Sequence, residues 1–133
     1  MNIILCLTIL FVSISCTGQK NIANNKCEEQ LAHAIAENWK YDSEGKYYRV
    51  KKSFIKDLHS TYFDCIKDKD ATFILDVFGN NPKERSIKNI KYAISLPCNS
   101  TSVLYCEYFE FIFSKDGKLK SCEETSEDVQ KIK

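Results

Sequence analysis

The sequence predicts an α+β fold in which two or three N-terminal helices pack on one face of a three-stranded antiparallel sheet. Three observations lead to this prediction. Apolar residues recur at helical spacing between residues 27 and 78, they alternate with polar residues between 90 and 123, and turn residues separate the segments. A run of helices followed by a run of strands is typical of α+β domains.

The first sixteen residues precede this domain and have the composition of an export signal. They carry no charge, and an apolar run from Ile3 to Val12 leads into Ser13 and Cys16. The run is shorter than the about 20 residues that a permanent membrane helix needs. Residues 13–16 resemble the lipobox of bacterial lipoproteins, in which small residues precede a cysteine that is acylated. This resemblance implies that residues 1–15 are removed and that Cys16 carries the lipid.

Residues 17–21 are polar and resemble the tether of a Bacteroidetes-type lipoprotein, and we assign residues 16–26 to a flexible tether. The chain departs from the lipobox pattern in two places, because no Lys or Arg precedes the apolar run and Ser13 stands where Leu is commonest. The alternative is an ordinary signal peptide cleaved after Gly18, which would remove Cys16. Since no acidic run follows Cys16, we expect a domain that faces the periplasm from the outer membrane.

The helices are predicted from apolar stripes and capping residues. A first helix spans Cys27 to Trp39, where every fourth residue is apolar, and Trp39 is interpreted as a buried anchor rather than a recognition residue. A second helix spans residues 51–67. A third runs from Ala71 to Phe78, with Asp70 as its cap and Gly79 at its end.

A stretch around the third helix resembles the SmpA/OmlA (BamE-like) lipoprotein domains. The matching residues are Cys65 to Asp70, Ile74, Val77-Phe78-Gly79 and Pro82. The chain departs from that pattern at Asp68, where the family usually has Gly, and by one extra residue before Pro82. The resemblance covers residues 54–123. It implies a meander of antiparallel strands and a non-catalytic binding role, which the related beta-lactamase-inhibitor-like proteins share.

Three strands are predicted from alternation, at residues 90–96, 105–113 and 119–123. Phe109, Phe111 and Phe113 share one face of the second strand, which we interpret as sheet core under the helices rather than as a ligand wall. A tight turn with Gly117 joins the last two strands. The domain therefore spans residues 27–124, and residues 125–133 read as a flexible tail.

Seven cysteines in a short exported chain indicate an oxidising compartment. Two of them, Cys6 and Cys16, lie in or beside the signal. The remaining five are Cys27, Cys65, Cys98, Cys106 and Cys122. Antiparallel helices would bring Cys27 to Cys65, and a hairpin would bring Cys98 to Cys106. Cys122 is left as a free thiol, predicted opposite Glu110 and partly open to solvent.

The sequence predicts no metal, cofactor or catalytic site. No pair of cysteines has C-x-x-C spacing and neither His33 nor His59 lies four residues from another histidine, so we expect no metal and no cofactor. Asp57 and Asp64 lie near His59 in sequence, but no nucleophile stands at a spacing that would complete a general-base site. A histidine within hydrogen-bonding reach of a carboxylate in a closed cleft would favour an enzyme.

The function predicted from these observations is that of a membrane-anchored periplasmic lipoprotein, acting as a protein-binding or envelope-assembly module. The alternative is an inhibitor or immunity-type lipoprotein that blocks a toxin or hydrolase. An enzyme is not predicted, because the sequence has no Gly-rich phosphate loop and no nucleophile elbow. The net charge of +1 gives no field to attract nucleic acid. The expected partners are the membrane, through lipid on Cys16, and an envelope protein.

Overall fold

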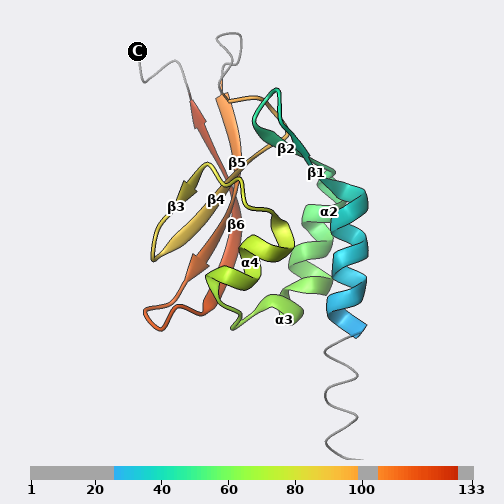
Figure 1. Ribbon diagram of the computed structural model, residues 1–133, viewed down its shortest axis with the longest axis vertical. Coiled ribbons are helices and arrows are strands. Elements are labelled where there is room, and N and C mark those ends of the chain that lie inside the picture. The colour runs from blue at the N-terminus through green and yellow to red at the C-terminus, as the bar shows by residue number, and fades with distance from the viewer. Residues whose placement is uncertain (1–25, 99–104, 129–133) are drawn as a thin grey trace, which may run out of the picture.

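A six-stranded mixed sheet forms one layer of the structure, and helices cover one of its faces (Figure 1). The computed structural model describes residues 26–98 and 105–128. Neighbouring strands follow the order β1-β2-β4-β5-β6, and β3 pairs with β4 beside this path. The strands are β1 Trp39–Asp42, β2 Tyr47–Val50, β3 Glu84–Arg85, β4 Asn89–Ile94, β5 Tyr105–Phe113 and β6 Leu119–Asp128.

The predicted architecture of N-terminal helices on a three-stranded antiparallel meander is therefore wrong, although the chain is α+β. Strands β4, β5 and β6 do follow one another in antiparallel order. However, β2 joins the other edge of β4 in parallel, through the pair Tyr48 and Ile94. Parallel strands need a long crossover connection, and the helical segment between β2 and β4 supplies it. The helices lie between strands rather than all before them.

The hairpin of β1 and β2 was not among the predicted elements. Its turn is built by Asp42, whose carboxylate accepts hydrogen bonds from the N–H groups of Glu44 and Gly45 at 3.0 Å each. The guanidinium of Arg49 donates to the same carboxylate at 2.6 Å. The Gly45 and Arg49 bonds hold the pKa of Asp42 below its usual range.

The helices are an N-terminal helix at residues 26–38, α2 Lys52–Asp57, α3 Phe63–Ile66 and α4 Ala71–Phe78. A π-helical turn, η1 Leu58–Tyr62, joins α2 to α3 within the predicted second helix. Helix α4 has its predicted bounds. The Asp70 carboxylate accepts a hydrogen bond from the Phe73 N–H at 2.9 Å, and Gly79 ends the helix with φ of 116°.

The hydrophobic core fills the space between the helices and the sheet. Phe109, Phe111 and Phe113 are buried there, as predicted. Trp39 begins β1 instead of ending the first helix, yet it is 4% exposed, and its indole N–H donates to the Phe78 carbonyl at 2.7 Å. This hydrogen bond satisfies the polar atom of a large side chain that the core encloses.

The pairing of β5 with β6 corrects the position of Cys122. Phe113 pairs with Leu119 as expected, but Ile112 pairs with Ser121, so Lys120 is an extra residue in a β-bulge. One extra residue shifts the side chains that follow to the opposite face. Cys122 consequently lies opposite Phe111, joins the core and is 9% exposed. The predicted pairing with Glu110 and the predicted solvent exposure are both wrong.

Strand β6 also extends further than expected. It continues to Asp128 and pairs with β5 along its length, through residues 125–128 that were assigned to the flexible tail. Residues 129–133 lie outside the described part of the chain. The far end of β6 and the start of the N-terminal helix lie at opposite ends of the molecule (Figure 1). The described domain therefore begins at one end of the molecule and reaches the other end at the close of β6.

Candidate functional site

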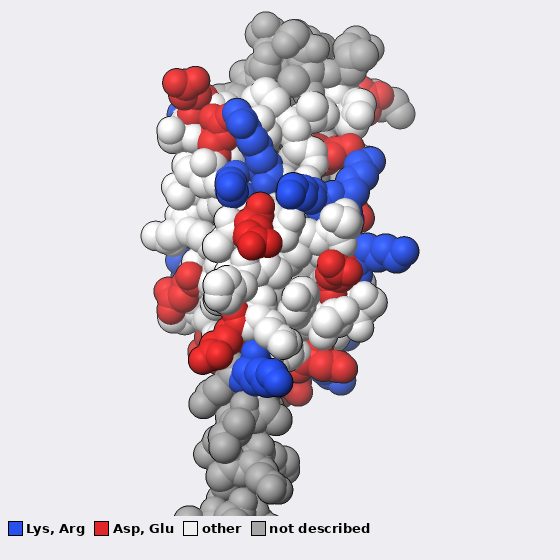
Figure 2. All heavy atoms as spheres, turned by 90° about the vertical axis from the view of Figure 1, so that its right-hand side faces the viewer, with Lys and Arg blue, Asp and Glu red and all other residues white. Residues whose placement is uncertain are grey.

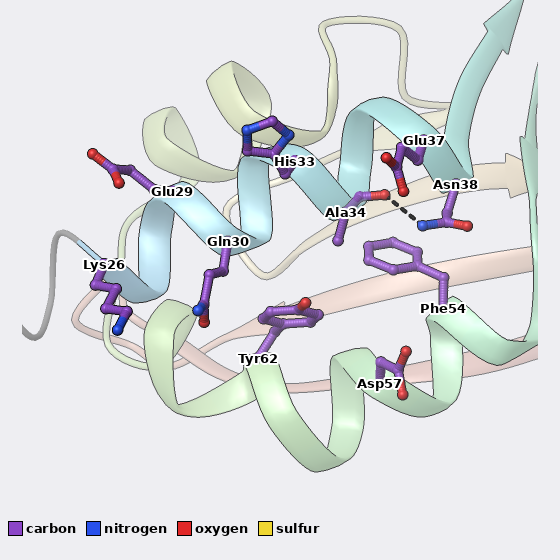
Figure 3. Close-up of a pocket in the computed structure, with 10 residues that line it drawn as sticks. All are labelled: Lys26, Glu29, Gln30, His33, Ala34, Glu37, Asn38, Phe54, Asp57 and Tyr62. Atoms are coloured by element: carbon purple, nitrogen blue, oxygen red, sulfur yellow. Dashed lines mark hydrogen bonds between the residues drawn. The ribbon is translucent and has the colours of Figure 1, made fainter.

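A groove of about 790 Å³ lies between the N-terminal helix and the segment formed by α2 and η1. We call it the helix groove. Figure 3 shows its two helical walls with aromatic rings standing between them. The residues that line it are Lys26, Glu29, Gln30, His33, Ala34, Glu37, Asn38, Phe54, Asp57 and Tyr62.

The N-terminal helix forms one wall because its polar residues share a face. Glu29, His33 and Glu37 recur every four residues, which places them along one side of the helix. Leu31 and Ile35 turn the other way and are buried in the core. The amphipathic pattern that packs this helix on the sheet thus also leaves a polar face beside the groove.

The opposite wall supplies the aromatic residues. Phe54 is 1% exposed and lies at the base of the groove, and Tyr62 is half-buried beside it with 6.4 Å between the ring centroids. Tyr62 is the last residue of η1 and Phe54 belongs to α2. The groove therefore has an aromatic floor and polar rims (Figure 3).

The groove carries more negative than positive charge. Glu29, Glu37 and Asp57 are exposed, and Lys26 is the single ammonium group that lines it. None of the three carboxylates takes part in an ion pair within residues 26–98 and 105–128, where the ion pairs involve other acids. The whole chain has a net charge of +1, so the acidity of the groove is local.

His33 lines the helix groove but forms no hydrogen bond with a carboxylate in the described part of the chain. The groove is open between its walls rather than closed over a reaction centre (Figure 3). The arrangement that would have favoured an enzyme is not formed at this histidine.

His59 makes a contact that the sequence did not reveal. Its Nδ1 atom lies 3.9 Å from the Sγ atom of Cys122, a residue 63 positions away, and its ring packs on Phe109. Burial, and then the charge of Glu123, raise the pKa of Cys122 to about 11. The thiol is therefore protonated at neutral pH and is a weak nucleophile, despite its histidine neighbour.

The structure brings together the same two cysteine pairs that the sequence suggested. The Cα atoms of Cys27 and Cys65 are 6.0 Å apart and those of Cys98 and Cys106 are 5.4 Å apart, and both pairs are disulfides. Cys122 is the free cysteine among the described residues. Cys16, the predicted lipidation site, lies outside the described part of the chain.

Two further features are absent from residues 26–98 and 105–128. No group of three or more His, Cys, Asp or Glu side chains there could hold a metal ion. No helix in these ranges combines the length and the apolar character needed to cross a membrane.

Comparisons with protein-family models, with curated proteins and with solved structures found no match to this chain. The resemblance to SmpA/OmlA domains remains a prediction from the residues between Phe54 and Glu123. Asp68, which stands where that family usually has Gly, has φ of 66°, in the left-handed region.

Proposed function

We propose that this chain is a lipid-anchored envelope protein that binds another envelope protein and catalyses no reaction. On this proposal the lipid is attached to Cys16, residues 16–26 form the tether, and the domain faces the periplasm from the outer membrane. The support from sequence is the uncharged N-terminal segment that ends in Ser13-Ile14-Ser15-Cys16.

The observation that carries the proposal is the pairing of four cysteines in the described domain. Disulfides persist in oxidising compartments such as the periplasm and are rare in the cytosol. The pairs Cys27–Cys65 and Cys98–Cys106 therefore agree with an exported domain, as the N-terminal segment suggests independently. Stable attachment would require more than one acyl chain, because a single chain binds a bilayer only marginally.

The helix groove is the surface that we propose for the partner. It is larger than the groove of about 390 Å³ between the N-terminal helix and α4. Its exposed polar rims and aromatic floor match the composition of protein-binding surfaces, which combine a desolvated aromatic centre with a polar rim.

The anchor is tested by replacing Cys16 with Ala. This variant should lose fatty-acid labelling and appear in the soluble periplasmic fraction, whereas Cys6→Ala, which alters a cysteine of the removed segment, should behave as the unsubstituted chain does. Protease added to whole cells should leave the domain intact. Unsubstituted protein that is soluble and begins at Gln19 would show that the lipid assignment is wrong.

Partner binding is tested by crosslinking the lipidated protein in native envelopes and identifying the product by mass spectrometry. A single specific envelope partner is expected. If that partner is a hydrolase or toxin whose activity falls on binding, the inhibitor role replaces the assembly role. If no crosslinked partner forms, the proposed binding function is refuted.

A further inference from the structure

We propose that the helix groove binds a basic amphipathic segment of the partner protein, with Lys or Arg side chains on the acidic rim and apolar side chains on the aromatic floor. This inference rests on the proposed binding function and specifies the chemistry of the partner. The charge, the floor and the shape of the groove each support it.

The charge of the groove favours a cationic partner. Glu37 on the N-terminal helix and Asp57 on α2 stand on opposite walls, near the same end of the groove (Figure 3). Neither is in an ion pair within the described residues, although lysines elsewhere in the domain pair with Glu28, Glu84 and Glu127. A positive side chain placed between Glu37 and Asp57 would reduce the repulsion between two like charges and gain both attractions.

The floor favours a guanidinium or ammonium group flanked by apolar atoms. The Tyr62 ring is half-buried, stands between the helices and lies next to the buried Phe54 ring. A cation over an aromatic face is attracted by the ring quadrupole, and the attraction grows when the site is partly desolvated. The domain already contains two such contacts, Lys69 over Phe73 and Lys91 over Tyr108, at 5.0 and 5.1 Å.

The shape of the groove favours a segment of polypeptide. It runs beside the N-terminal helix from Lys26 to Asn38, and it is open along its length (Figure 3). Amphipathic helices dock in grooves of this kind through residues on one face. A bound metal ion is disfavoured, because no suitable group of three ligands occurs in the described part of the chain.

The surrounding surface restricts where a cation of the partner can lie. On the face that carries the N-terminal helix, the basic side chains gather mainly in the upper half, toward the β1–β2 hairpin, and acidic side chains lie around and below them (Figure 2). Lys26 lies at the opposite end of the groove from Glu37 and Asp57 (Figure 3). The Glu37 end of the groove is the end nearest the hairpin. A cation of the partner segment should therefore lie directly between Glu37 and Asp57, because the basic side chains beyond them would repel it.

The test measures binding of a fluorescent helical peptide, with Lys and Arg on one face and Leu on the other, to the purified full chain. A peptide with Glu in place of Lys and Arg is the charge control. The variant Glu37→Gln with Asp57→Asn removes both rim charges. Its matched control is Asp76→Asn with Asp116→Asn, which removes two exposed charges from α4 and from the β5–β6 turn. All variants are first compared by thermal melting.

We expect the basic peptide to bind and the acidic peptide not to bind. The rim variant should bind the basic peptide about tenfold more weakly, as expected for the loss of two exposed ion pairs, and the matched control should bind as the unsubstituted chain does. Tyr62→Phe should retain binding and Tyr62→Leu should weaken it several-fold. Equal weakening by both double variants, or no binding by the unsubstituted chain, would overturn the inference.

Failure of this inference can be separated from failure of the proposed function. If the lipidated protein crosslinks to its envelope partner and the rim variant does so equally well, the groove assignment fails while the binding function stands. If the lipidated protein crosslinks to no partner, the binding function itself fails.

Discussion

Replacing Gly79 by Ala should destabilise the domain strongly, because two separate costs meet at this residue. Gly79 ends α4 with φ of 116° and ψ of 152°, a backbone conformation in which only glycine is common. A Cβ atom added here would also press on the ring of Tyr48, at 3.0 Å from Cζ and 3.1 Å from Cε1, and would lie still closer to its hydroxyl oxygen.

The loss of stability in Gly79→Ala combines the backbone strain and the contact with Tyr48. Backbone strain at such a residue amounts to about 1–3 kcal/mol. Tyr48 cannot move aside freely, because it is 3% exposed and its ring packs on Trp39 and Tyr92 at centroid distances of 5.4 and 5.2 Å. Overpacking of this kind costs about 1–3 kcal/mol. The free energy of unfolding should therefore fall by about 2–6 kcal/mol.

Urea unfolding followed by far-UV circular dichroism measures this loss, and Gly117→Ala is the matched control. Gly117 also has positive φ, of 76°, but a Cβ atom there would meet nothing within 4 Å. The control should lose only about 1 kcal/mol. Tyr48→Phe combined with Gly79→Ala should lose less than the sum of the two single variants. Equal losses for Gly79→Ala and Gly117→Ala would refute the contact with Tyr48.

The two disulfides should contribute unequally to the free energy of unfolding, because Cys27–Cys65 joins residues 38 positions apart and Cys98–Cys106 joins residues 8 positions apart. Cys65→Ala should cost about 4 kcal/mol and Cys98→Ala about 2.5 kcal/mol in urea unfolding. Because burial raises the pKa of Cys122 from 9.0 to about 11, the unfolded state releases the thiol proton first, so the free energy of unfolding should fall between pH 9 and 11. Cys122→Ala should abolish the part of this fall in unfolding free energy that the thiol causes. A pH profile identical to that of the unsubstituted chain would count against the burial of the Cys122 thiol. Deleting Lys120 should leave the Cys122 side chain facing the core, so the deletion variant and the unsubstituted chain should both react slowly with a thiol reagent. Rapid labelling of the unsubstituted chain alone would indicate that its β5–β6 hairpin lacks the bulge.

Elements whose signals are local were predictable from the sequence. The bounds of α4 follow from Asp70, which caps the first turn, and from Gly79, which tolerates positive φ. The bounds of β5 follow from strict alternation, because its phenylalanines face the core and Tyr108 faces the other side of the sheet. In both cases the residues that define the element lie within it.

Features that depend on distant partners were not predictable in the same way. Strands β1 and β2 have four residues each, too few for alternation to stand out, although aromatic residues on both sides of the Asp42–Gly45 turn are a hairpin signal. The parallel pairing of β2 with β4 has no local signal. The bulge at Lys120 has none either, and it alone moved Cys122 into the core.

The helix groove was missed for the same reason. Glu37 and Asp57 lie on different elements, and neither residue belongs to a motif that the sequence reveals. Only the packing of the N-terminal helix beside α2 and η1 places these acids on facing walls. A charge pattern along one helix could not have revealed a site shared by two.

The N-terminal helix is held at both ends, which gives the groove a fixed width. Near its start, the Cys27–Cys65 disulfide joins it to α3 and the Lys69 ammonium pairs with Glu28 at 2.9 Å. At its end, the Asn38 carbonyl accepts a hydrogen bond from the Lys51 N–H at 3.2 Å, just before α2. A wall held in this way is already ordered, so binding of the proposed partner would lose little conformational entropy.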